Sequence, residues 1–223
     1  MNDNRLGGLA LILGALSGII TLTFHPAGVG HHVTPAQFEV LIAVIIGVHI
    51  LAIAGLPVSF AGALALTHRI DSPVHLATLG LIVYGFGAVA MMAAAAMSGL
   101  VIPSILRETA GHITAGDQAH TFLSYTHSIN QAFAKIGAAA FCIAILLWSI
   151  VILKNRPLPL SLGVYGLVSS IAIVLAMIIG KLDTELHGFR IFTLAQAIWC
   201  IAAGVCLWRL SLTTQLERTA AGF

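Results

Sequence analysis

Charged side chains are scarce in this sequence. Asp, Glu, Lys and Arg make up 8% of its 223 residues, whereas hydrophobic residues make up 59%. Soluble domains carry about 25% charged residues, so a chain with so few charges cannot surround an apolar core with a polar surface. We therefore expect lipid to be its solvent. The formal net charge of +2 and the lack of a basic run argue against a nucleic-acid partner.

Catalytic signatures are missing as well. The sequence contains no H-E-x-x-H, nucleophile elbow, P-loop, dinucleotide-binding fingerprint or C-x-x-C-H haem-attachment motif. Its three cysteines, Cys142, Cys200 and Cys206, lie in apolar runs without C-x-x-C spacing, which is typical of buried, unreactive thiols. The sequence therefore assigns no reaction, and whether the protein is an enzyme stays open.

Long apolar runs dominate what is present. A bilayer core is about 30 Å thick and needs about 20 helical residues to cross it. The predicted spans are 6–24, 38–66, 74–102, 121–153, 158–180 and 190–210. Because helices satisfy every backbone group in lipid, we expect an all-α integral membrane bundle of six transmembrane helices, one domain over residues 1–223. The first run, about 19 residues, is long for a signal peptide and is interpreted as a retained helix.

The loop charges predict an orientation. With both termini on one side, that side holds Arg5, Arg69, Lys154, Arg156, Arg209 and Arg218. The other side holds only Arg107, Lys181 and Arg190. Because Lys and Arg are enriched in cytoplasmic loops, we expect both termini in the cytoplasm and the protein in a bacterial cytoplasmic (inner) membrane.

Polar side chains interrupt the fourth predicted span. His127, Gln131 and Lys135 follow a four-residue spacing, which places them on one helix face near the outer edge of the bilayer. A polar face is costly against lipid, so we expect it to face the bundle interior or a wet cavity. Lys135 either extends its ammonium to the interface or pairs with a carboxylate such as Glu39.

His49 lies at a comparable depth in the second span, with Glu39 at the outer mouth of that span. We therefore predict a ligand pocket formed by His49, His127, Gln131, Lys135 and Glu39. Alternatively, His49 has no ligand and only forms a hydrogen bond with a neighbouring helix. His49 and His127 are candidate ligands for a transition metal, or axial ligands of a b-type haem.

The outer loops are rich in histidine. His25, His31 and His32 follow the first span within the stretch HPAGVGHH. Three imidazoles on a flexible loop are a second candidate metal site. Their spacing matches no known zinc or copper signature, and a solvated loop is the simpler explanation.

Small residues form stripes on two helices. Ala10, Gly14 and Gly18 share one face of the first span, and the third contains the run from Met91 to Gly99. Such stripes let helices approach closely in lipid, either within one bundle or against a membrane-protein partner or a second copy. Three functions remain open: a protein that binds a small ligand, metal or haem; an accessory subunit of a larger membrane complex; and a small-solute transporter or channel.

Overall fold

The computed structural model describes residues 3–26, 34–70, 75–109, 116–182 and 185–220, and every regular element in these ranges is a helix. The elements are α1 (Asp3–Phe24), α2 (Pro35–Arg69), α3 (Leu76–Ala96), a π-helical turn η1 (Met97–Val101), α4 (Ile102–Thr109), α5 (Gly116–Asn155), α6 (Leu160–Ile178) and α7 (Leu186–Ala220). Among the described residues, six helical runs are long and apolar enough to cross a membrane. The prediction of an all-helical protein with six such segments is confirmed.

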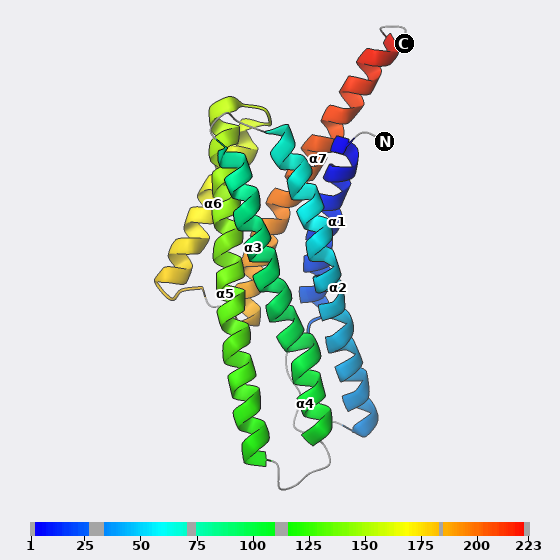
Figure 1. Cartoon of the computed structure of the whole chain (residues 1–223), viewed down its shortest axis with the longest axis vertical. Coiled ribbons are helices and arrows are strands. Elements are labelled where there is room, and N and C mark those ends of the chain that lie inside the picture. The colour runs from blue at the N-terminus through cyan, green and yellow to red at the C-terminus, as the bar shows by residue number, and fades with distance from the viewer. Residues whose placement is uncertain (1–2, 27–33, 71–74, 110–115, 183–184, 221–223) are drawn as a thin grey trace.

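The third apolar segment is longer than expected. It runs from Leu76 to Glu108 instead of ending at residue 102, because α3, η1 and α4 follow one another without a break (Figure 1). Pro103 is a residue at which a helix is usually expected to end. Here it is the second residue of α4, just after the π-helical turn, where the regular pattern of backbone hydrogen bonds is already interrupted.

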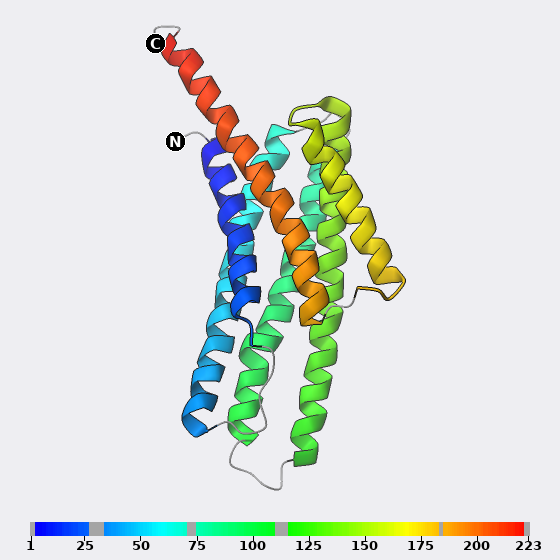
Figure 2. The ribbon, with the colours of Figure 1, turned by 180° about the vertical axis from the view of Figure 1, so that it is seen from behind.

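The helices form a ring in which α1 packs between α2 and α7, and α3 packs between α2 and α5. Helix α6 lies against α5 and makes only a small contact with α7. The start of α1 and the end of α7 lie at the same end of the bundle (Figure 1). At the opposite end, α2, α4 and α5 extend beyond α1, α6 and α7 (Figure 2).

Small residues bring α1 close to both of its neighbours. A Cβ atom on Gly14 would lie 2.8 Å from Ser59 Cα on α2, and one on Gly8 would lie 2.5 Å from the Gly204 carbonyl oxygen on α7. A Cβ on Gly18 would meet Thr193, also on α7, at 3.4 Å. The small-residue face of α1 is therefore used within the bundle.

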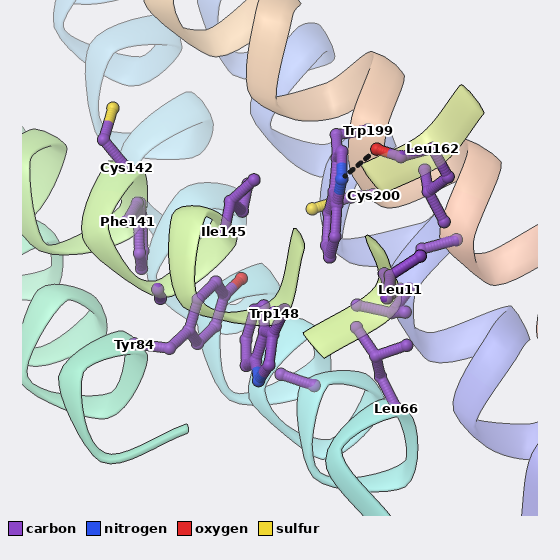
Figure 3. Close-up of a cluster of buried hydrophobic side chains, with 14 of the residues drawn as sticks. Leu11, Leu66, Tyr84, Phe141, Cys142, Ile145, Trp148, Leu162, Trp199 and Cys200 are labelled. Carbon is purple, nitrogen blue, oxygen red and sulfur yellow. Dashed lines mark hydrogen bonds between the residues drawn. The ribbon is translucent and has the colours of Figure 1, made fainter. Parts of the chain in front are cut away.

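Aromatic side chains pack together in the interior of the bundle, among buried leucine, isoleucine and cysteine side chains (Figure 3). Trp148 of α5 stacks on Trp199 of α7, with ring centroids 5.8 Å apart and planes 9° apart. Each indole also donates a hydrogen bond to a backbone carbonyl, Trp148 to Ala77 at 3.0 Å and Trp199 to Leu162 at 3.2 Å. Both rings are almost fully buried, and with their polar atoms satisfied they join α3, α5, α6 and α7.

Two of the three cysteines are buried, as the sequence predicts. Cys142 and Cys200 are buried and Cys206 is half-buried, and all three are free thiols. They pack as small apolar side chains.

Candidate functional site

A cavity of about 430 Å³ lies between α1, α2, α3 with η1, α5 and α7. It runs from Ser59 and Tyr84 in the interior of the bundle toward His127 and Glu185, in the direction away from the chain ends. Its wall is mostly apolar, and each helix also contributes polar side chains to it. These are Ser17, Thr21, His25, His49, Ser59, Tyr84, Ser98, His127, Asn130, Gln131, Glu185, Thr193 and Gln196.

His49 is buried in the wall contributed by α2. Its Nδ1 lies 2.7 Å from the Ile45 carbonyl oxygen, one helical turn earlier. A carbonyl only accepts hydrogen bonds, so Nδ1 carries the proton and the neutral ring is left with an Nε2 lone pair. The side chain packs on Gly99 of η1, where a Cβ would overlap the imidazole, so glycine is required at that contact.

His25 follows the last residue of α1, and its ring meets that of His49 edge to face, with centroids 5.1 Å apart and planes 71° apart. Its Nδ1 lies 3.0 Å from the Pro26 carbonyl oxygen, which fixes the same tautomer as in His49. Burial lowers the pKa of His25 below its usual 6.5; the bond to Pro26 opposes this shift and the charge of Arg190 adds to it. His25 is therefore neutral at pH 7.

Asn130 of α5 holds the π-helical turn in place. Its Nδ2 donates to the Ala94 carbonyl oxygen at 2.7 Å and to Ser98 Oγ at 2.6 Å. A π-helical turn disturbs the regular pattern of backbone hydrogen bonds, and a side-chain amide satisfies the carbonyl group beside it. The sequence analysis did not assign Asn130 to the site. The available signal was an amide in an apolar helix, where polar groups need partners.

Two buried hydroxyl groups mark the deep end of the cavity. Ser59 Oγ of α2 and Tyr84 Oη of α3 lie 2.5 Å apart, and the Tyr84 ring packs against Phe141 with centroids 4.5 Å apart. Gln196 of α7 is nearby in the wall. Its Nε2 contacts Cys142 Sγ at 3.6 Å, and its buried Oε1 has no hydrogen-bond partner among the described residues.

A contact between an imidazole and a carboxylate joins α5 to the residue before α7 at the opposite end of the cavity, which we call the mouth. His127 Nε2 lies 3.3 Å from Glu185 Oε1, and both side chains are more than half exposed. Arg190, on α7, donates two hydrogen bonds of 3.2 and 3.3 Å to the Leu22 carbonyl oxygen in the last turn of α1. The guanidinium thus lies where the negative end of the α1 dipole favours a cation.

The structure brings together part of the predicted pocket. His49, His127 and Gln131 line the cavity, together with His25. Lys135 is exposed and is not among the lining residues. Glu39 forms its ion pair with Arg107 at 2.9 Å, not with Lys135. His31 and His32 lie outside the described residues.

The helical repeat explains why Lys135 leaves the wall. Each four-residue step turns the side chain by about 40° beyond a full turn, so Lys135 points about 80° away from His127. Ala134 is seven residues after His127, within about 20° of it, and Ala134 is the residue that lines the cavity.

No group of three or more His, Cys, Asp or Glu side chains able to hold a metal ion occurs among the described residues. The pair of His25 and His49 offers two imidazoles. No protein-family model, curated protein or solved structure matches the chain, so functional inference depends on this geometry.

Proposed function

We propose that this protein is a multi-pass protein of the bacterial cytoplasmic membrane that binds a small organic molecule in the cavity between its helices. The observation that carries the proposal is the cavity itself. Its volume of about 430 Å³ is within the range of about 300–1,000 Å³ that is usual for small-molecule sites. Such sites have apolar walls and a few polar groups that fix orientation, and five helices supply this combination here.

The loop charges support a cavity that opens away from the cytoplasm. The end of the bundle that carries both chain ends also holds most of the loop Lys and Arg residues, and such residues favour the cytoplasmic side. In a cysteine-free background, an impermeant maleimide added to intact cells should label a cysteine at Glu108 and leave one at Asn155 unlabelled. Both positions are exposed. The reverse pattern would overturn the orientation.

Ligand binding is tested by blocking the cavity. Ala52 lines it, whereas Ala54 on the same helix is exposed on the outside of the bundle. Organic extraction and mass spectrometry of protein purified in nanodiscs should find a bound molecule in the wild type and in Ala54→Phe, and much less of it in Ala52→Phe. Equal amounts in the two variants would contradict binding in this cavity.

A transition metal at His25 and His49 is a second candidate, favoured by the contact between the two rings. Both rings donate Nδ1–H to backbone carbonyls. In metal sites, a hydrogen bond of this kind orients the histidine so that its other nitrogen can bind the metal. Elemental analysis should then find copper or zinc that is lost in His49→Gln. A haem between His49 and His127 would have to break the contact of His127 Nε2 with Glu185, and it would give a Soret band.

A transport path has less support. It would have to continue past the deep end of the cavity, through the half of the bundle where Trp148 and Trp199 are almost fully buried. Binding within the cavity requires no such path.

A further inference from the structure

The ionisable groups of the cavity limit the charge of its occupant. No Lys, Arg or Asp is among the lining residues, and the single lining carboxylate, Glu185, is paired with His127 at the mouth. A charged group deeper in the cavity would lose its hydration without gaining a counter-ion, which is costly in an apolar environment. The deep part of the cavity therefore favours an uncharged molecule.

The helical rise gives the length of the cavity. Fourteen residues separate His127 from Phe141 on α5, and fourteen separate Leu186 from Cys200 on α7. At 1.5 Å per residue, both helices give a length of about 20 Å. The cavity volume of about 430 Å³ spread over this length gives a cavity that is longer than it is wide. This shape suits an extended hydrocarbon chain.

The deep end supplies a recognition group. Ser59 and Tyr84 share one hydrogen bond, which uses one of their two hydroxyl hydrogens. The described residues provide no acceptor for the second hydrogen. Both side chains line the cavity. The pair can donate one hydrogen bond to an oxygen atom and accept one in return.

We propose that the occupant is an uncharged, single-chain molecule, an alkyl or isoprenoid chain that ends in a hydroxyl or carbonyl oxygen, with this oxygen bound by the Ser59–Tyr84 pair. The inference rests on the proposed ligand-binding function and specifies its substrate class. The imidazoles of His25 and His49, which also line the cavity, then lie along the outer part of the chain.

Dodecanol is a probe of suitable length and chemistry. Binding of tritiated dodecanol to immobilised nanodiscs is measured by scintillation proximity, with empty nanodiscs as the blank. Unlabelled dodecanol should compete at least tenfold better than dodecanoate or dodecyltrimethylammonium at about pH 8, where the carboxylate is ionised. The gain from octanol to dodecanol should exceed the gain from dodecanol to hexadecanol, because the last does not fit within the cavity length. Equal or better competition by either charged probe would overturn the proposal.

Tyr84→Phe tests the recognition group. It removes the hydroxyl and keeps the ring that packs on Phe141, and it should weaken competition by dodecanol about fivefold without changing that by dodecane. Tyr125→Phe, at an exposed position of α5, is the control. Ser59→Ala should act like Tyr84→Phe and replaces it if that variant does not fold. An unchanged ratio of dodecanol to dodecane affinity in both variants would refute recognition by this pair.

The two proposals fail in different ways. If no dodecyl probe binds, but extraction finds a molecule that Ala52→Phe removes and Ala54→Phe retains, then the substrate class is wrong and ligand binding stands. If no probe binds and extraction finds no such molecule, both proposals fall. The identity of an extracted molecule also shows whether the occupant comes from the host membrane.

Discussion

The two halves of this bundle use small residues in opposite ways. In the half with the chain ends, a glycine faces a bulky group: a Cβ on Gly80 would lie 2.8 Å from Trp148 Nε1, and one on Gly166 would lie 2.8 Å from Trp199 Cδ1. In the other half, Ala15, Ala52, Ala95 and Ala134 lie along the wall of a cavity. The space beside these glycines is filled by a large side chain, whereas the space beside these alanines is left open as the cavity.

The lengths of the helices contribute to this difference. At the end away from the termini, α1, α6 and α7 stop short of α2, α4 and α5 (Figures 1 and 2). The wall near the mouth is completed by the exposed contact between His127 and Glu185 and by hydrogen bonds from Arg190 to the end of α1. Such exposed contacts contribute less to stability than buried aromatic packing.

Removing the central indole should have the largest effect. Trp148→Ala should lower the free energy of unfolding by about 3–5 kcal/mol, because the side chain is almost fully buried and stacks on Trp199. Phe189→Ala, at a half-buried residue of the cavity wall, should cost less than half as much. Equilibrium unfolding in mixed micelles measures both, and equal losses would show that the two halves are packed equally tightly.

Close contact between α1 and α7 should produce the next largest effect. Gly8→Ala should destabilise the protein by about 1–3 kcal/mol, because the added Cβ meets the Gly204 carbonyl oxygen, which is backbone and cannot rotate away. Gly47→Ala is the matched control. No atom lies within 4 Å of its Cβ position, so it should be neutral or stabilising by up to about 1 kcal/mol. Similar destabilisation in both variants would contradict the close α1–α7 crossing.

A smaller loss of stability is expected when the hydrogen bonds around η1, beside the cavity, are removed. Asn130→Ala removes two donor contacts, to Ala94 and Ser98, and should cost about 1 kcal/mol. Hydrogen exchange of the amides in 97–101 should become faster, because the turn loses its support from α5. Ser128→Ala, whose hydroxyl bonds only within α5, should leave exchange unchanged. Unaltered exchange in Asn130→Ala would show that the turn holds its shape without α5.

The smallest expected effect is the pH dependence at His25. Its pKa is lowered in the folded protein by burial, with Arg190 adding to the shift and His49 as the adjacent ring. The folded state therefore binds fewer protons than the unfolded state, so this contribution is present above pH 6.5 and is lost as the pH falls below it. Unfolding between pH 7 and 5 should show a shallower loss of stability in His25→Gln than in the wild type. An identical slope would contradict the shift.

Composition and run length were enough to predict the six apolar helices, because the cost of unsatisfied backbone groups in lipid applies to each segment separately. Because each segment is assessed separately, the third segment was expected to end at residue 102, whereas it continues to Glu108. Whether a chain can continue through Pro103 depends on the π-helical turn before it, and the contacts of that turn with His49 and Asn130 come from α2 and α5.

The sequence by itself determined that His49, His127 and Gln131 should avoid lipid, because desolvation penalises each polar group wherever it lies. The tertiary structure decided which groups meet. It placed His49 against His25, His127 against Glu185 and Glu39 against Arg107, and it turned Lys135 outward. Which helices are neighbours, and at what rotation, depends on how small and large residues match between helices. That match is a property of pairs of helices, so it cannot be predicted from the sequence of one apolar run alone.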